Sequence, residues 1–348
     1  MNAKNGFKIL FTIIFIQFLF LSCISSGGEK EESISNFVKG ADISWLPQME
    51  NSGFKFYDKN GNQKDCLTIL KENGINTIRL RTWVNPSEDA INGHCSSSET
   101  IKMAKRAFEN GFDIMIDFHY SDSWADPSKQ VKPAAWNGHT ITQLQSDVYN
   151  YTYKFMEDLK LAGVKAKWVQ IGNEINPGMM LPEGSSNDMP ALSKLINSGY
   201  DAVKKSDSNS KVVVHLSSGA DNSLFRWFFD GLKNNDTKYD VIGMSYYPYW
   251  DGKSYTANID SLENNMQDMI KRYNKEIMIV ETGEKYNKAD ESYNMIREII
   301  KRVKKLPKSK GIGVMYWEPE GAVNWSNYEL SCWESSGKPT KALEAFIE

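Results

Sequence analysis

The sequence predicts an α/β protein in which residues 37–348 form a single (β/α)8 TIM barrel. Short apolar, β-branched stretches alternate with amphipathic ones, the apolar stretches number eight, and the chain has 348 residues. Strands that alternate with helices are typical of a parallel sheet, and α/β barrels reach this length as one domain. An open doubly wound sheet is the alternative, but Gly40–Ser44 at the first strand is not a glycine-rich phosphate loop.

The predicted strands are short and end at polar or turn residues. They are Val38–Ile43, Thr77–Leu80, Asp113–Phe118, Trp168–Ile171, Lys211–His215, Val241–Ser245, Ile277–Val280 and Gly313–Trp317. Amphipathic stretches between them predict helices at Asp65–Asn73, Glu99–Asn110, Leu144–Ala162, Ala191–Ser206, Leu262–Tyr273 and Ser292–Val303. Gly74, Gly111 and Gly163 each follow one of these stretches, as glycine often does where a helix ends.

Residues 1–36 differ in composition from the rest of the chain. Lys4 and Lys8 precede a short apolar run, which is typical of a secretory signal peptide and predicts one over residues 1–22. The following Cys23 resembles the lipidated cysteine of bacterial lipoproteins; a plain secreted protein is the alternative. Residues 23–36 are rich in Ser, Gly, Glu and Lys and predict a flexible tether. We therefore expect an exported protein, lipid-anchored to the bacterial outer membrane or cell surface.

Composition narrows the possible partners. The net charge is -3 and no basic tract is present, which argues against nucleic acid. The chain contains 10 Trp and 16 Tyr residues, and aromatic rings serve both as core and as flat platforms for the apolar faces of ligands. We expect a monomer.

Polar residues stand at the carboxyl end of every predicted strand. In a barrel these ends form the active-site face. One such residue is readily explained as a paired group of the core, which is the preferred interpretation of His215 alone. Because buried polar groups cost free energy unless paired, polar endings on all strands indicate one common site. The residues are Asp42, Arg79, Arg81, Asp117, His119, Asn173, Glu174, His215, Ser245, Tyr246, Tyr247, Glu281, Trp317 and Glu318.

Glu174 and Glu281 each end a separate buried strand. Two carboxyl groups, one protonated and one ionised, are what glycoside hydrolysis requires. Arg79 or Arg81 near Glu281 would favour its ionised form, and apolar or carboxylate-rich surroundings would keep Glu174 protonated. We expect Asn173 to hydrogen-bond the sugar hydroxyl next to the anomeric carbon. Tyr246 is expected to hold the nucleophile through its hydroxyl.

Two other chemistries are disfavoured. His119, Asp117 and His215 lack the spacing of a metal site, and the chain has only four histidines. No G-x-S-x-G motif is present for a serine nucleophile.

Seven stretches carry a family resemblance, in order, from about residue 38 to the end. They are Gly40–Ser44, Gly74–Pro86, Asp117–Pro127, Gly172–Ile175, Ser245–Pro248, Val280–Thr282 and Tyr316–Pro319. With them the chain resembles glycoside hydrolase family 53, the arabinogalactan endo-β-1,4-galactanases, of the clan of (β/α)8 retaining glycosidases. The resemblance implies Glu174 as acid/base, Glu281 as nucleophile, and endo-hydrolysis of β-1,4-galactan, a polysaccharide side chain of pectin.

Two alternatives remain beside this assignment. One is a mannanase or cellulase of the same clan. The other is a surface lipoprotein that binds glycans without turnover, against which the presence of both Glu174 and Glu281 argues.

The remaining sugar contacts are expected around this pair. Aromatic faces should come from Trp124, Trp317, Trp325 and Tyr246, and polar partners from Asp42, Arg79, Arg81, His119, Asp122, Asn173 and His215.

The chain departs from the family pattern at three places. One is Met180-Leu181-Pro182, where the family has Leu-Trp-Pro. Glu320-Gly321 stands where the family usually has Ala-Trp, so one stacking tryptophan is missing, and Trp325 or Trp333 are the candidates to replace it. The loop after Glu281 lacks the segment that binds calcium in some bacterial members. No cofactor is therefore expected, with calcium left open.

Three cysteines follow Cys23. Cys66 is predicted to be a small buried apolar residue. Cys95 and Cys332 fall in loops after the second and last strands, so a disulfide between them is possible, and spacing alone does not decide it.

Overall fold

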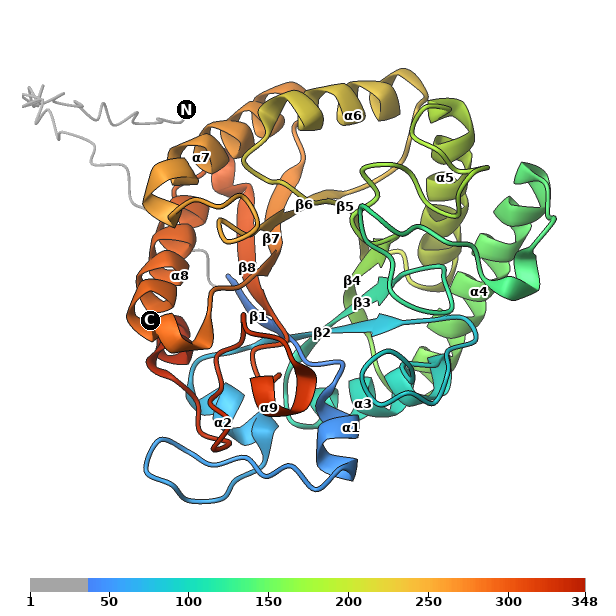
Figure 1. The fold of residues 1–348 in the computed structure, drawn as a ribbon. Coiled ribbons are helices and arrows are strands. Elements are labelled where there is room, and N and C mark those ends of the chain that lie inside the picture. Colours follow the sequence, from blue (N-terminus) through green and yellow to red (C-terminus); the bar gives the residue numbers. More distant parts are fainter. Residues whose placement is uncertain (1–36, 348) are drawn as a thin grey trace, which may run out of the picture. The chain divides into compact units, whose positions relative to one another are not determined.

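Eight parallel strands close into a barrel in chain order (Figure 1). The computed structural model describes residues 37–347. The predicted (β/α)8 fold is confirmed, whereas the predicted signal peptide, tether and Cys23 lie outside the described residues. The strands are β1 (Val38–Asp42), β2 (Thr77–Thr82), β3 (Asp113–Phe118), β4 (Ala166–Ile171), β5 (Lys211–Leu216), β6 (Val241–Tyr246), β7 (Glu276–Thr282) and β8 (Gly311–Trp317).

Helices surround the barrel on the outside (Figure 1). They are α1 (Leu46–Asn51), α2 (Cys66–Glu72), α3 (Ser97–Glu109), α4 (Ile141–Leu161), α5 (Met189–Ser206), α6 (Asn222–Asn234), α7 (Tyr255–Tyr273), α8 (Ala289–Lys304) and α9 (Val323–Ser326). Short 3-10 helices are η1 (Ala134–Trp136), η2 (Tyr286–Lys288), η3 (Pro307–Ser309) and η4 (Lys341–Phe346). None of the helices within residues 37–347 is both long and apolar enough to cross a membrane.

Several helices begin earlier than the apolar periodicity predicts. Helix α3 begins after Ser96 and α4 after Thr140, and in each case the side chain of that residue and of the Glu or Gln three positions on form a reciprocal capping box. Helix α7 begins at Tyr255, seven residues before the predicted Leu262. The apolar periodicity marks only the buried face of each helix, and the first turn, which is largely polar, carries no such signal.

Successive side chains of each strand point alternately into the barrel and outward to the layer beneath the helices. Eight inward side chains form a separate apolar cluster that fills the barrel: Val38, Met115, Trp168, Val213, Val241, Met278, Val280 and Met315. Asp42, Asp117, His215 and Ser245 continue these inward rows, whereas Glu281 directly follows the inward Val280, at an irregularity in the pairing of β6 with β7. Strand register places Asp42 beside Arg79, and Asp117 beside Arg81, two residues further along β2.

The seam between β1 and β8 has no room for a side chain at two glycines. A Cβ at Gly313 would lie 2.2 Å from Val38 Cβ, and one at Gly40 would lie 2.5 Å from Met315 Cγ. Both distances are far inside van der Waals contact. The glycines therefore allow the first and last strands to pair and close the barrel.

The three cysteines within the described residues are all free and buried. The possible Cys95–Cys332 disulfide is not formed. Cys95 Sγ lies 3.7 Å from the Ser44 carbonyl oxygen, and burial raises the pKa of its thiol to about 12. Cys66 is a buried member of the main apolar core, as expected.

Candidate active site

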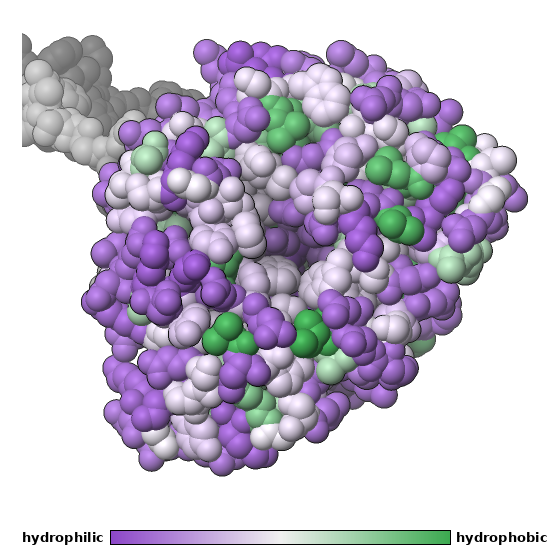
Figure 2. All heavy atoms as spheres, in the orientation of Figure 1, coloured by the Kyte–Doolittle hydropathy of each residue, from purple (hydrophilic) through white to green (hydrophobic). Residues whose placement is uncertain are grey.

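A cleft of about 630 Å³ opens where the strands end, and Figure 2 shows the corresponding face hollowed near its centre. The volume lies in the usual range for small-ligand sites. Its lining includes His119, Trp124, Asn173, Glu174, Ser245, Tyr246, Tyr247, Trp250, Glu281, Trp317 and Tyr328. The structure thus brings together seven of the predicted site residues, while Asp42, Arg79, Arg81, Asp122, His215 and Trp325 do not line the cleft.

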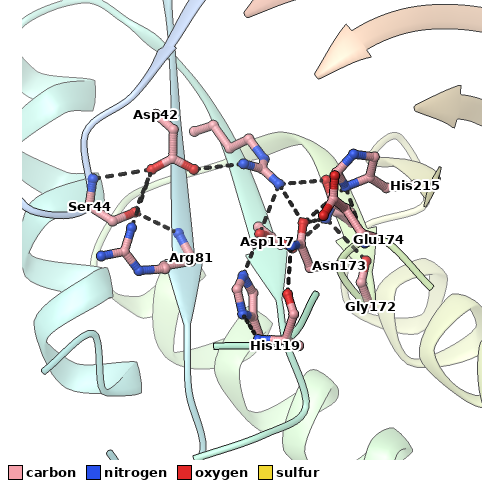
Figure 3. Close-up of polar contacts among 12 residues, drawn as sticks. Asp42, Ser44, Arg81, Asp117, His119, Gly172, Asn173, Glu174 and His215 are labelled. Atoms are coloured by element: carbon pink, nitrogen blue, oxygen red, sulfur yellow. Dashed lines mark hydrogen bonds and ion pairs between the residues drawn. The ribbon is translucent and has the colours of Figure 1, made fainter. Parts of the chain in front are cut away.

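The fully buried guanidinium of Arg79 lies beneath this cleft. Its Nη1 lies 2.8 Å from Asp42 Oδ2 and 2.9 Å from Glu281 Oε1, and its Nη2 lies 2.9 Å from Asp117 Oδ2. Burial by itself lowers the pKa of Arg79, but the three carboxylates more than offset this and raise it above its usual value. Asp42 and Asp117 are therefore structural partners of Arg79 within the barrel (Figure 3).

Glu281, near the end of β7, has one cationic and one phenolic partner. Its Oε1 is bound by Arg79, and Tyr247 donates its hydroxyl to Oε2 at 3.2 Å. The expectation that Tyr246 holds this carboxylate is wrong. Tyr246 donates its hydroxyl at 2.6 Å to Asn258 Oδ1.

The alternation of inward and outward side chains along β6 identifies Tyr247 as the tyrosine that faces the cleft. Val241 points into the barrel, and every second residue after it continues the inward row through Ser245 to Tyr247. The Tyr246 ring therefore faces the layer beneath the helices and joins the main core, although the residue borders the cleft.

Glu174 follows β4 and is partly open to the cleft. Ser245 donates its hydroxyl to Glu174 Oε1 at 2.6 Å, and the Glu174 amide lies 3.4 Å from His215 Nδ1. In the pairing of β6 with β7, Ser245 is also the partner of Glu281. Ser245 therefore hydrogen-bonds Glu174 and lies beside Glu281 in the sheet.

The two glutamates differ in their hydrogen-bonding partners, and this difference decides which of them is protonated. Burial is the main cause that raises the pKa of Glu174, to about 7, and it also raises the pKa of Glu281, although Arg79 opposes this. Because ionisation of one carboxyl disfavours ionisation of the other, the pair retains a proton. Glu281 contacts a guanidinium and Glu174 contacts a neutral hydroxyl, so the proton belongs on Glu174.

Asn173 joins the carboxylate cluster to the cleft. Its Oδ1 accepts hydrogen bonds from Arg79 at 3.0 Å and from Gln170 at 3.0 Å, and its Nδ2 donates to the Ala125 carbonyl at 2.8 Å. The amide nitrogen carries a second N–H, which leaves a donor for a ligand. Gln170, which is not among the predicted site residues, also donates to Asp117 Oδ1 at 2.6 Å. Its inward position, two residues after Trp168, follows from the strand period of two.

Two histidines are fixed by neighbours. His119 lines the cleft, accepts at Nδ1 from the Trp83 indole at 3.1 Å and lies 3.0 Å from Asp117 Oδ2 at Nε2. His215 lies 2.7 Å from Ser245 Oγ. Burial, followed by the charge of Arg79, lowers the pKa of His215 well below its usual value, so this ring is neutral.

Arg81 supports an aromatic wall and does not line the cleft. It is buried, forms an ion pair with Glu318, and places its guanidinium carbon 4.3 Å from the centroid of the Trp124 ring. The rings of Trp45 and Trp83 lie at 5.5 and 5.2 Å from the same carbon. A guanidinium over tryptophan faces is attracted by the ring quadrupole, so Arg81 holds these rings in place.

The wall itself consists of four rings in edge-to-face contact: Trp45, Trp124, Trp317 and Tyr328. Trp325 packs against Trp45 and donates its indole N–H to Ser52, outside the cleft lining. Trp333 is fully buried. Tyr328, not either of these tryptophans, adds an aromatic face beside Trp317.

Asp122 has a role in the loop after β3. Its carboxylate accepts backbone N–H groups from Asn85 at 2.9 Å and Ala134 at 2.8 Å. It therefore connects three loop segments and does not line the cleft.

No group of three or more His, Cys, Asp or Glu side chains within residues 37–347 is placed to hold a metal ion. The expectation that the protein needs no cofactor stays a prediction.

Comparison with known proteins decides the family. The model of glycosyl hydrolase family 53 matches residues 38–346. The chain belongs to this family.

Its relatives cover almost the whole barrel. The chain is 31% identical to an endo-beta-1,4-galactanase of Bacillus subtilis (strain 168), over 86% of this chain and 76% of that protein. It is 32% identical to an arabinogalactan endo-beta-1,4-galactanase of Thermothelomyces thermophilus, over 88% of this chain and 98% of that protein. The solved family 53 catalytic domain of Ignisphaera aggregans superposes with a TM-score of 0.81 at 31% identity, over 89% of this chain and 95% of that domain. The mannanase, cellulase and non-catalytic alternatives are therefore not favoured.

The departure from the usual family 53 pattern at Glu320 creates a buried carboxyl pair. Glu318 and Glu320 are both fully buried, and neither Glu320 oxygen meets an N–H or hydroxyl donor among the described residues. Burial, then the charge of Glu318, raises the pKa of Glu320 well above its usual value. A protonated Glu320 donates to Glu318, which satisfies both groups and leaves Glu318 ionised opposite Arg81.

We expect Glu320→Gln to stabilise this family 53 enzyme at high pH, because the amide can donate to Glu318 without carrying a titrating proton. A group whose pKa is raised by folding contributes full stability below its unfolded pKa and loses that contribution as pH rises through the folded value. The melting temperature of the variant should exceed that of the wild type by roughly 2–4 °C or more at pH 8. The difference should shrink toward pH 4.5, as measured by thermal unfolding across pH.

The control for this measurement is Glu109→Gln, since the Glu109 side chain is 63% exposed at the end of α3. A pH-independent difference for Glu320→Gln, or a loss of stability at pH 8, would show that Glu320 is ionised in the folded protein.

Proposed function

We propose that this protein is a retaining endo-β-1,4-galactanase that hydrolyses the (arabino)galactan side chains of pectin. The observation that carries the proposal is the pair of unlike glutamates in one cleft. Glu281 is held as a carboxylate by Arg79 and Tyr247, and Glu174 retains a proton beside Ser245. The family 53 relatives named as galactanases supply the substrate class.

In the first step, the Glu281 carboxylate attacks the anomeric carbon as the bond from that carbon to the leaving oxygen breaks. Glu174 donates its proton to the leaving oxygen, so the departing galactan chain ends in a neutral hydroxyl. The product on the protein is a galactosyl ester of Glu281. As this ester forms, the negative charge that Arg79 had stabilised on Glu281 is lost and one appears on Glu174.

In the second step, Glu174, now ionised, takes a proton from water as the water oxygen attacks the anomeric carbon. The ester bond breaks, Glu281 becomes a carboxylate again, and Glu174 regains its proton. Both inversions occur on the same carbon, so the anomeric configuration is retained. The retaining geometry calls for the two carboxyl groups to be about 5–5.5 Å apart.

The hydrogen bonds around Glu174 can follow its protonation state. When Glu174 is ionised, Ser245 donates to it. When Glu174 is protonated, the Ser245 hydroxyl can turn to the neutral His215, whose Nε2 lies 2.7 Å from Ser245 Oγ. Ser245 then accepts a hydrogen bond from protonated Glu174, which keeps its proton and its position in the cleft until the leaving oxygen arrives.

The walls of the cleft suit a galactose chain. A β-linked galactose has one face rich in C–H groups, which packs on aromatic rings such as Trp317 and Tyr328, and an axial hydroxyl that needs a directed partner. His119 and Asn173 are polar groups of the cleft lining. Because a hydrogen-bonding site rejects a ligand that leaves its groups unpaired, discrimination against glucose and mannose epimers follows.

Purified protein should release oligosaccharides from β-1,4-galactan much faster than from β-1,4-mannan or cellulose. Glu281→Ala should lower kcat on galactan by about 10⁴-fold or more, because the attacking oxygen is gone, and it should still bind the polysaccharide. Product sizes by chromatography and binding by calorimetry measure both effects. Glu109→Ala is the control for expression and folding.

Equal rates on galactan and on mannan or cellulose would move the protein to another substrate. Substantial residual turnover by Glu281→Ala would mean a different nucleophile.

The acid role of Glu174 predicts a pH dependence. Since the pKa of Glu174 is raised to about 7, kcat/KM on galactan should fall as pH rises through that value, because the acid form is lost. Glu174→Gln should lower kcat/KM on galactan by about 10²–10⁴-fold and remove this alkaline limb. On an activated dinitrophenyl galactobioside, which needs no proton donor, bond cleavage by the variant should persist; an unchanged alkaline limb in Glu174→Gln would assign it to another group.

We also propose that the protein is exported and anchored through a lipid on Cys23, on the sequence pattern of residues 1–23. Stable anchoring requires more than one acyl chain, which lipoproteins carry on this cysteine. In cells, Cys23→Ser should move the protein from the membrane to a soluble fraction, with Cys66→Ser as the control. A wild-type protein without lipid by mass spectrometry would contradict the anchor.

A further inference from the structure

Trp250 is an exposed tryptophan at the rim of the cleft. Of the large apolar side chains of residues 37–347 that are exposed, namely Phe108, Val131, Leu161, Trp227, Trp250 and Ile347, it alone lines the cleft. Its exposed fraction is 67%. An apolar ring left in water at a ligand site, while other rings of the cleft are packed together, has a surface available for a ligand.

The loop after β6 holds this ring in place. Trp250 donates its backbone N–H to the Tyr247 carbonyl at 3.1 Å, and its ring meets the Tyr249 ring edge to face at a centroid distance of 4.6 Å. The next residue, Asp251, accepts a hydrogen bond from Asn258 at the start of α7 at 2.9 Å. Hydrogen bonds therefore fix the turn that carries Trp250. Its ring packs against Tyr249, and most of its surface remains exposed.

Barrel order places Trp250 across the mouth from the aromatic wall. In a closed barrel of eight strands, β6 lies opposite β2. The wall of Trp45, Trp124, Trp317 and Tyr328 follows β1, β3 and β8, on both sides of β2. The cleft thus has two aromatic ends, and the two glutamates on β4 and β7 lie between them.

The contacts of the two glutamates distinguish these ends. Each glutamate has a hydroxyl partner after or on β6, Tyr247 for Glu281 and Ser245 for Glu174. They differ in their second partner, which is Arg79 of β2 for Glu281 and His215 of β5, approached by the backbone amide, for Glu174. The acid must lie beside the oxygen of the leaving group. The leaving chain therefore extends from Glu174 toward the loops after β5 and β6, where Ser217, Ser218 and Trp250 line the cleft.

We propose that Trp250 is the aromatic platform of a leaving-group subsite, on which a galactose of the departing chain stacks through its C–H-rich face. The inference rests on the proposed galactanase function, because it assigns the direction of the chain from the acid Glu174. It makes Trp250 a residue that determines preference for long substrates. It also predicts that Trp250 binds the acceptor when the galactosyl ester on Glu281 is transferred to a sugar hydroxyl, whose proton passes to Glu174.

The test compares a substrate that has sugars on the leaving side with one that has none there. β-1,4-Galactopentaose fills positions on both sides of the broken bond, whereas β-galactobiosyl fluoride has a leaving group of one atom. Trp250→Ala should lower kcat/KM on galactopentaose by about tenfold, the scale of one lost apolar contact, and should leave the fluoride within about twofold of wild type. Transfer from the fluoride to added galactobiose should fall in parallel, and Trp250→Phe should recover much of the loss.

The matched control is Trp227→Ala, since Trp227 is 49% exposed on α6 and does not line the cleft; it should match wild type on both substrates. Unchanged kinetics of Trp250→Ala on galactopentaose, or equal losses on the pentaose and the fluoride, would overturn the proposal.

The test of Trp250 can fail or succeed independently of the proposed galactanase function. If the wild type prefers another β-1,4-glycan, galactan is not the substrate. Trp250 is still supported if Trp250→Ala then lowers kcat/KM on the long oligosaccharide of that other sugar and leaves kcat/KM on its glycosyl fluoride unchanged. If the wild type has no turnover, the affinity of each variant for galactopentaose, measured by calorimetry, tests the role of Trp250. Weaker binding by Trp250→Ala than by Trp227→Ala supports the platform, and equal binding overturns it.

Discussion

The site depends on one buried cation, the guanidinium of Arg79. A buried carboxylate without a partner is strongly unfavourable, yet Asp42, Asp117 and Glu281 from three strands lie within 2.9 Å of its nitrogens. One positive charge cannot neutralise three carboxylates and a fourth at Glu174. A proton on one carboxyl group reduces the excess negative charge, and the contacts leave that proton on Glu174. The different roles of the two glutamates therefore follow from how a single arginine is shared.

Arg81, the second arginine of β2, is also a buried cation with more than one carboxyl group near it. Arg81 pairs with Glu318, and the additional carboxyl of Glu320 is buried with no donor among the described residues, so it holds a proton as Glu174 does. The result differs because the face of Arg81 lies against tryptophans. Two arginines spaced by two on one strand thus support different parts of the cleft: Arg79 sets its charges and Arg81 its aromatic wall.

The fold and the position of the site could be predicted from sequence because both depend on local patterns. Strand length, the alternation with helices and the polar strand ends are visible in the chain, and parallel strands bring those ends together. What could not be predicted depends on side-chain direction beyond the strand. Arg81 was expected to contact sugar and instead supports rings, Asp122 binds loop backbone, and Trp325 packs outside the cleft. The role of Tyr247 could have been predicted by extending the alternation of inward and outward side chains on β6 one residue beyond the end of the strand.

The backbone at the mouth is strained at Glu174 and at three other residues that follow barrel strands. Glu174 and Glu318 both have φ of 45°, and Tyr120 and Ser218 have φ of 48° and 59°, a region that costs non-glycine residues about 1–3 kcal/mol each.

The surrounding polar network offsets this strain. The Glu318 amide donates to the Asp42 carbonyl at 3.0 Å, and the Gln130 side chain donates to the Asn173 carbonyl at 2.7 Å, just before Glu174. A regular extended residue at either position would turn the carboxyl away from its partner. The same buried hydrogen bonds and ion pairs that set the protonation of the site therefore also hold the backbone in the conformation that presents it.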